Sequence, residues 1–229
     1  IAAFFEVHIE QGPILEAEEK TIGIVQGVQG MRWYDVEVTG MESHAGTTPM
    51  DRRKDAIVGA ARMVDALDNL GNDNRPDART TCGMFDISPG SRNVIPGHVS
   101  FSADIRHPDD DILVGLGEQF GEACRKIAAD MKLELKFEEI WYSPPVNFAE
   151  NCISAVEQAA AALGMPSRPI ISGAGHDAVY ISRVAPAGMI FIPCEDGVSH
   201  NEIEAASPED VAAGCDVLLN AMVTCANDV

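Results

Sequence analysis

The segment from residue 32 to residue 142 constrains the fold most strongly, because its hydrophobic residues change period in a fixed order. Residues 98–107 (HVSFSADIRH) alternate between apolar and polar side chains, as a half-exposed strand does. Residues 112–131 instead place apolar side chains at helical spacing. The whole segment reads as strand, helix, strand, strand, helix and strand, at 32–39, from Asp51 to about 70, 79–88, 98–107, 112–131 and 133–142. This order predicts the split β-α-β pattern of a ferredoxin-like α+β sandwich.

The sequence on either side of this segment has the pattern of an α/β domain. Apolar runs predict strands before residue 30 and helices alternating with strands after Ser143-Pro144-Pro145, at 2–9, 22–28, 151–163, 169–172, 177–183, 188–192 and from Ser207 onward. We therefore predict that residues 1–29 and 143–229 form one α/β domain. Residues 30–142 would then be an inserted α+β domain.

Composition excludes several classes of function. Acidic residues outnumber basic ones by 36 to 16 among 229 residues, giving a formal charge of -20. Such a chain repels nucleic-acid phosphates and anionic membranes, so we expect neither as a partner. None of its apolar runs approaches the ~20 residues of a membrane span.

The cysteines indicate a compartment. Six are present, without a C-x-x-C pair, which predicts free thiols rather than a disulfide framework. The sequence shows no signal peptide either. We therefore expect a cytoplasmic location.

Four histidines stand beside carboxyl groups in strand ends or turns: His8, His44, His176 and His200. This combination is typical of a metal-dependent or acid–base enzyme. None belongs to an H-E-x-x-H pair, so their spacing does not choose between ligand, catalyst and ordinary structural histidine.

Two other patterns have competing interpretations. Residues 173–178 (GAGHDA) follow an apolar run and match G-x-G-x-x-A, which suggests a dinucleotide site such as one for NAD. The short helix that follows, cut by Pro186, argues against it. His107-Pro108-Asp109 has the H-x-D form used by two-metal hydrolases, but a solvated helix cap explains it better. Glu138-Glu139 reads as an exposed pair.

Six motifs in order give a more specific reading: HIEQGPILE, GMESHAGTTPM, SRNVIPG, DIRH, SGAGHDA and SHNEIE. Together they resemble the metal-dependent amidohydrolases that include N-carbamoyl-L-amino-acid hydrolases, β-ureidopropionases and allantoate amidohydrolases. That group is similar to the aminoacylase and carboxypeptidase-type dizinc hydrolases. The resemblance extends from His8 to the last predicted helix, and implies a dizinc-hydrolase catalytic domain carrying an inserted dimerisation domain.

The resemblance also implies a set of ligands around two divalent metal ions, zinc or manganese. His8 would bind one ion and His200 the other. Gln11 would lie beside the substrate, and Gly175 and His176 would line its pocket. Two metals can generate a bound hydroxide and polarise a carbonyl, which hydrolysis of an unactivated C–N bond requires.

The remaining implied residues lie in the inserted domain. The resemblance makes the protein a homodimer, in which His44 reaches into the partner subunit's site and stabilises the oxyanion. Asn93 and Arg106 would bind the carboxylate of a small-molecule substrate, since an arginine fork matches that group.

One part of the family pattern lies outside the sequence. The other metal ligands and the general base precede HIEQG in the family, whereas this sequence begins at Ile1. We therefore expect a C-terminal fragment that holds metal weakly and is inactive alone. The whole enzyme would hydrolyse an N-carbamoyl amino acid to the amino acid, CO2 and ammonia. Hydrolysis of allantoate, and a non-catalytic binding or dimerisation module, are the alternatives.

Overall fold

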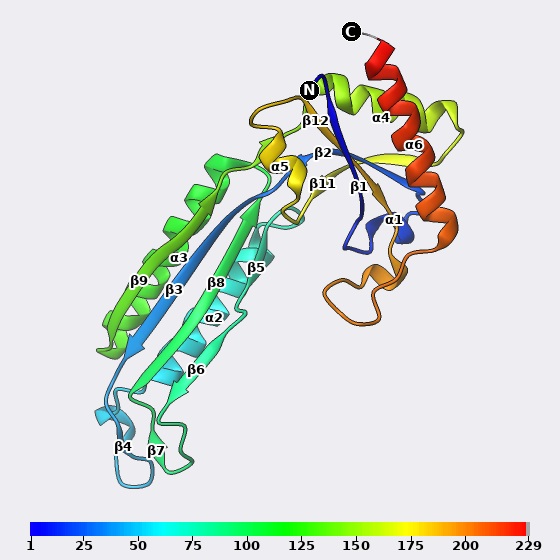
Figure 1. The fold of residues 1–229 in the computed structure, drawn as a ribbon. Coiled ribbons are helices and arrows are strands. Elements are labelled where there is room, and N and C mark those ends of the chain that lie inside the picture. The colour runs from blue at the N-terminus through cyan, green and yellow to red at the C-terminus, as the bar shows by residue number, and fades with distance from the viewer. Residues whose placement is uncertain (228–229) are drawn as a thin grey trace. The chain divides into compact units, whose positions relative to one another are not determined.

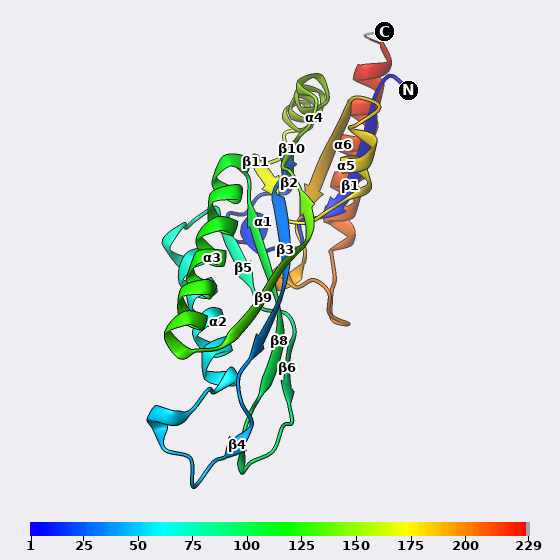
Figure 2. The same ribbon diagram turned by 90° about the vertical axis from the view of Figure 1, so that its left-hand side faces the viewer.

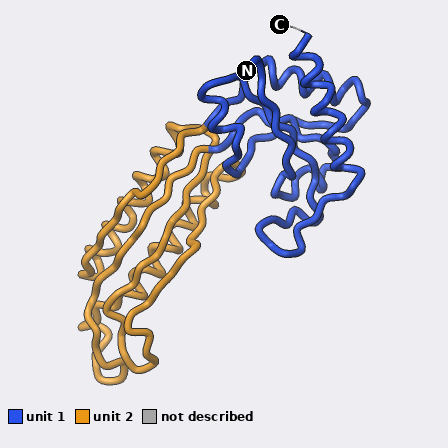
Figure 3. The backbone as a smooth tube through the Cα atoms, viewed as in Figure 1, with its two compact units in different colours: residues 1–29, 146–229 blue, residues 30–145 orange. Residues whose placement is uncertain are grey.

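The computed structural model describes residues 1–227, which form two compact units, residues 1–29 with 146–227 and residues 30–145 (Figure 3). The boundary falls after Pro145, three residues later than the sequence predicts. The reason is local: the last long strand of the second unit runs to Ser143, and a Cβ on Gly30 would lie 2.6 Å from the ring of Pro145. Residues 143–145 therefore pack with the inserted unit.

The first unit is a mixed five-stranded sheet with helices on both faces (Figure 1). Its elements in chain order are β1 Phe4–Ile9, α1 Ile14–Ala17, β2 Ile22–Val28, β10 Val146–Asn147, α4 Glu150–Ala162, β11 Ser167–Ser172, α5 Asp177–Ile181, β12 Ala187–Ile192, the 3-10 turn Glu195–Gly197 and α6 Pro208–Asn227. Strand β1 runs parallel to β12, and β12 runs antiparallel to β2.

Burial explains the apolar composition of strand β12. All six of its residues are buried, because Ile190 and Ile192 pack toward α4 and α6 whereas Met189 and Phe191 pack with α1 and α5. A strand covered on both faces reads as a continuous apolar run. The predicted start of the last helix is confirmed: the Ser207 hydroxyl accepts a hydrogen bond from the Asp210 amide, capping α6.

The second unit is an antiparallel sheet with two helices on one face (Figure 2). Its elements are β3 Gly30–Thr39, β4 Ser43–His44, the 3-10 turn Met50–Arg52, α2 Ala56–Asp73, β5 Arg79–Thr81, β6 Phe85–Ser88, β7 Val94–Ile95, β8 His98–His107, α3 Asp110–Met131 and β9 Glu134–Ser143. In the sheet, β8 and β3 lie centrally, β9 forms one edge, and β5 and β6 share the other. The apolar side chains of β8 and the inner faces of α2 and α3 make one core.

Two predicted elements need correction. The helix predicted from Asp51 begins at Ala56, because Asp55 caps it by accepting the Val58 amide and residues 50–52 form a separate 3-10 turn. The strand predicted over 79–88 is two strands, interrupted at Cys82-Gly83-Met84. Asp109 caps α3 through the Ile112 amide, so the cap reading of His107-Pro108-Asp109 is confirmed.

Candidate active site

The first unit brings two loops together at one edge of its sheet. Strands β1 and β12 are parallel, so the loop after Ile9 and the loop after Ile192 leave the sheet at the same end. Ligands of open α/β sheets bind at the carboxyl ends of parallel strands. His8 and Gln11 come from the first of these segments and His200 from the second.

His8 is held in one tautomer. Its Nδ1 lies 2.9 Å from the backbone carbonyl oxygen of Ile9. A carbonyl can only accept, so in the neutral form of the ring Nδ1 carries the proton and Nε2 the lone pair. This arrangement fits a metal ligand, because ligating histidines usually donate their other ring N–H to a carbonyl or carboxylate.

His176 lies directly against His8. The two ring centroids are 4.7 Å apart in an edge-on arrangement, and His176 also contacts the Phe191 ring at 5.5 Å. Its Nε2 shares a hydrogen bond of 2.8 Å with the hydroxyl of Ser172. Burial and, to a smaller extent, the neighbouring His8 lower the pKa of His176 to about 4 against an opposing effect of Asp177, so the ring is neutral near pH 7. Gly175, one residue before, has open space where a side chain would stand.

Gln11 reaches across to the second loop. Its Nε2 donates to the hydroxyl of Ser199 at 2.9 Å, next to His200, across a sequence separation of 188 residues. His200 itself is exposed, with a left-handed φ of 56°. The structure thus brings His8 together with His176, and Gln11 together with the loop of His200.

The second unit brings His44 and Asn93 together. Strand β4 pairs with β7, opposing His44 to Val94, and the Ala45 amide donates to the Asn93 carbonyl at 2.9 Å. The guanidinium of Arg53 fixes the following loop by donating to the carbonyls of Ala45 and Thr48. Both predicted residues therefore stand at the small two-stranded sheet of β4 and β7.

Arg106 lies away from the β4–β7 sheet. Only Pro96 and Gly97 separate β7 from β8, and Arg106 lies eight residues beyond His98, roughly 26 Å at ~3.3 Å per residue. Its guanidinium binds the carboxylate of Asp104, with the shortest contact at 2.6 Å. Within one chain, Asn93 and Arg106 cannot bind the same small carboxylate.

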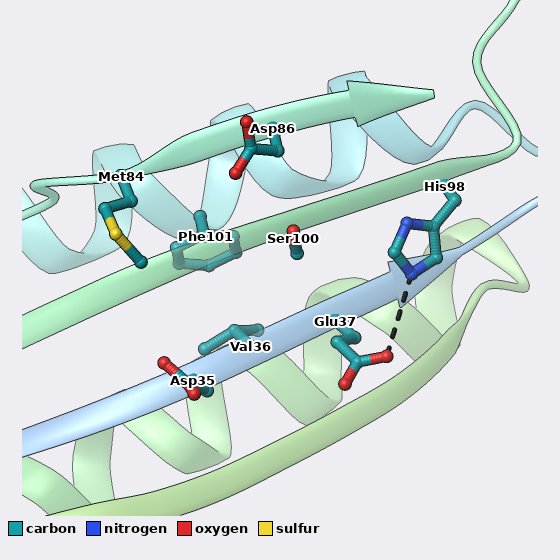
Figure 4. Close-up of a pocket in the computed structure, with 8 residues that line it drawn as sticks. All are labelled: Asp35, Val36, Glu37, Met84, Asp86, His98, Ser100 and Phe101. Atoms are coloured by element: carbon teal, nitrogen blue, oxygen red, sulfur yellow. Dashed lines mark ion pairs between the residues drawn. The ribbon is translucent and has the colours of Figure 1, made fainter. Parts of the chain in front are cut away.

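A separate hollow lies on the sheet face opposite α2 and α3 (Figure 4). The side chains that line it are Asp35, Val36, Glu37, Met84, Asp86, His98, Ser100 and Phe101. His98 pairs with Glu37 at 3.7 Å. Nowhere in residues 1–227 do three or more His, Cys, Asp or Glu side chains form a group that could hold a metal ion. The hollow contains none of the predicted site residues, so we do not treat it as the active site.

Sequence reasoning missed three partners of the predicted residues. Ser172 holds His176, and Ser199 and Glu204 hold the loop of His200. Ser172 and Ser199 lie inside or beside the motifs, which could have drawn attention to them. Glu204 could not be separated by sequence from Glu202.

Comparison with known proteins agrees with this architecture, which is the mixed α/β fold of M20 hydrolases. Residues 1–224 match Peptidase family M20/M25/M40, and the chain belongs to that family. In the part of the chain that the structure describes, no helix is long and apolar enough to cross a membrane.

Individual relatives point to one group within the family. The chain is 43% identical to an N-carbamoyl-L-amino-acid amidohydrolase of Rhizobium meliloti over 227 residues, which are 99% of this chain and 55% of that protein. It is 38% identical to an allantoate amidohydrolase of Bacillus subtilis, covering 93% of this chain and 52% of that protein.

A solved structure gives the same picture. An amidase of the hydantoinase/carbamoylase family from Burkholderia multivorans superposes with a TM-score of 0.94 at 52% identity, covering 98% of this chain and 55% of that one. The chain thus spans about half the length of the relatives it matches.

Proposed function

We propose that the whole protein hydrolyses the linear C–N bond of an N-carbamoyl amino acid, releasing the amino acid, CO2 and ammonia. The observation that carries this proposal is the prepared His8, whose Nε2 lone pair is fixed at the end of a parallel strand. The 43% identical relative bears the name of this activity. The relative of the same name from Paenarthrobacter aurescens, 38% identical, supports the same substrate class.

In this proposal His8 and His200 each supply one nitrogen ligand to a pair of divalent ions, zinc or manganese. The bound metals would supply an activated water and polarise the scissile carbonyl. Residues of the relatives' other half would complete the ligand set. Gln11, Gly175 and His176 would border the substrate, and Arg106 would exchange Asp104 for the substrate carboxylate.

His44 and Asn93 act as one group in this proposal. The Nδ1 of His44 accepts hydrogen bonds from the amides of Gly46 at 3.0 Å and Thr47 at 3.3 Å. The proton of the neutral ring is therefore on Nε2, which can donate to an oxyanion. Because Arg106 lies far from the β4–β7 sheet, we assign His44 and Asn93 to the partner subunit's site and Arg106 to the site of its own subunit.

Allantoate hydrolysis is the second candidate, favoured by the allantoate amidohydrolase at 38% identity. Allantoate also carries a carboxylate and a linear ureido group, so His44 and Arg106 would serve both substrates. The test is to load the whole protein with Zn2+ or Mn2+ and to measure ammonia from N-carbamoyl-L-amino acids and from allantoate. Turnover of the carbamoyl substrates supports the proposal, and turnover of allantoate alone replaces it.

We further propose a homodimer formed by β6, with a cytoplasmic location consistent with six free cysteines. β6 is an edge strand with four exposed residues, and apolar side chains there are open to solvent: Met84 61%, Phe85 37% and Ile87 41%. The opposite edge, β9, carries charges at Glu134, Lys136, Glu138 and Glu139, which discourage edge pairing. β6 has one acid, Asp86.

This edge also suits action in the partner's site. Ser88, the last residue of β6, pairs with His98, which is separated from β7 by only two residues. The small β4–β7 sheet, at which His44 and Asn93 stand, therefore lies at the same end of the larger sheet as β6. Pairing of two β6 strands would put each β4–β7 sheet beside the other subunit.

We expect Ile87→Lys to weaken this dimer, because two lysines would meet near the two-fold axis of the paired strands. The dissociation constant should rise by about tenfold or more. Sedimentation equilibrium measures it, and Ile140→Lys on β9 is the matched control, being 50% exposed on the other edge. A dimer weakened only by Ile140→Lys would assign the interface to β9 instead.

A further inference from the structure

The loop that follows His8 at the end of β1 and the loop that carries His200 are joined by a series of hydrogen bonds. Gln11 Nε2 donates to Ser199 Oγ at 2.9 Å, and the Ser199 hydroxyl donates to Glu204 Oε2 at 2.8 Å. The amide of His200 donates to the same carboxylate oxygen at 3.2 Å. Every donor and acceptor belongs to the first unit.

The hydrogen bonds of this series have only one possible donor-to-acceptor direction. A carboxylate can only accept, so the single hydroxyl proton of Ser199 goes to Glu204. Ser199 Oγ then accepts from Gln11, whose amide nitrogen is a donor. A carboxylate at position 11 could not replace that amide, because Ser199 has no second proton to give.

The backbone conformations of the two loops also fix how the loops pack against each other. Gln11 and His200 both have left-handed φ values, 59° and 56°, a strained conformation that non-glycine residues keep only where the surrounding structure holds them. Gly197 has a φ of +66°, and a Cβ there would lie 2.6 Å from the nitrogen of Pro13. The second loop therefore lies with its backbone against the first, and the Cys194 thiol donates to the Gly12 carbonyl at 3.7 Å.

We propose that Gln11, Ser199 and Glu204, together called the relay, are positioning residues that set the relation between the loop after His8 and the loop of His200. This inference rests on the proposed function, since it assigns both loops to one metal centre. It gives Gln11 a role beyond bordering the substrate: its amide orders the exposed loop of His200 before metal or substrate binds. Loss of the relay should lower metal affinity and kcat rather than raise KM.

The first measurement needs no metal. Amide hydrogen exchange of His200, followed by NMR on the metal-free whole protein, reports whether its bond to Glu204 is kept. Ser199→Ala should speed exchange by about tenfold, the effect of losing one ordinary hydrogen bond. Gln11→Glu should do the same. Ser199→Thr keeps the hydroxyl and should exchange close to the wild-type rate.

The second measurement uses the whole protein. Competition with a chelator should show Zn2+ dissociation constants about 10–100-fold higher for Ser199→Ala and Gln11→Glu, the usual effect of removing a group that orients a metal ligand. Ser199→Thr should restore the affinity. Asp196→Asn is the control for charge: it removes one charge from the same loop without changing Gln11, Ser199 or Glu204, and it should leave the affinity unchanged.

The outcomes separate the two proposals. Unchanged exchange at His200, or unchanged Zn2+ affinity with only KM raised, would overturn the relay and return Gln11 to the substrate. A wild-type whole protein that binds no Zn2+ would overturn the proposed function, and with it the relay's part in a metal centre. The exchange measurement would still decide whether the relay joins the loops.

Discussion

Replacing His44 with alanine should lower kcat of the whole protein by about 10²–10³, the usual effect of removing one oxyanion donor. Metal content should stay unchanged, because His44 Nδ1 is bound to backbone amides and, within residues 1–227, His44 belongs to no group of three or more metal-type side chains. Steady-state kinetics on an N-carbamoyl-L-amino acid, with elemental analysis of the same samples, measures both quantities.

The size of this effect follows from how the ring is prepared. Two backbone amides point at Nδ1, and Arg53 holds the loop that supplies them. The Nε2–H donor is thus oriented before substrate arrives, which is what makes such a donor effective. His98→Ala is the control, since it removes a partly exposed histidine, paired with Glu37, from the same unit. A near-normal kcat for His44→Ala would leave His44 as an ordinary loop residue.

Long periodic segments of the fold could be predicted from sequence. Strand β8 occupies the predicted residues 98–107, and helix α6 begins after its predicted cap at Ser207. Errors occurred where a local bond decides the boundary. Asp55, not Asp51, caps α2, and both are acids preceding the same apolar pattern. The hydrophobic period cannot distinguish them, because it describes the helix interior and not its end.

The candidate site was predictable as a set of residues but not as a set of contacts. The motifs indicate His8, His44, Asn93, His176 and His200, yet each motif is local. The edge-on contact of His8 with His176 depends on the packing of β1 beside β12. The separation of Arg106 from Asn93 follows from the length of β8, which the sequence already contained. Only the pairing of β4 with β7 shows at which end of the larger sheet His44 and Asn93 lie.

Replacing His8 with alanine should remove most of the activity, because it deletes a proposed ligand whose free nitrogen is already oriented. Metal assistance contributes several kcal/mol, so turnover should fall by about 10³-fold or more. Elemental analysis after dialysis should show the loss of bound metal, in contrast to His44→Ala. Full metal occupancy in His8→Ala would contradict the ligand assignment.

The two inactive variants together test action between subunits. In a mixed dimer of His8→Ala and His44→Ala, one site combines an intact His8 with an intact His44 from the other subunit. Random exchange makes about half of all dimers mixed, each with one such site, so about one quarter of wild-type activity should return. Differently tagged subunits, co-purified and assayed, measure the fraction exchanged. Action within one chain predicts no recovery at any degree of mixing, because every chain then lacks one of the two histidines that its own site requires.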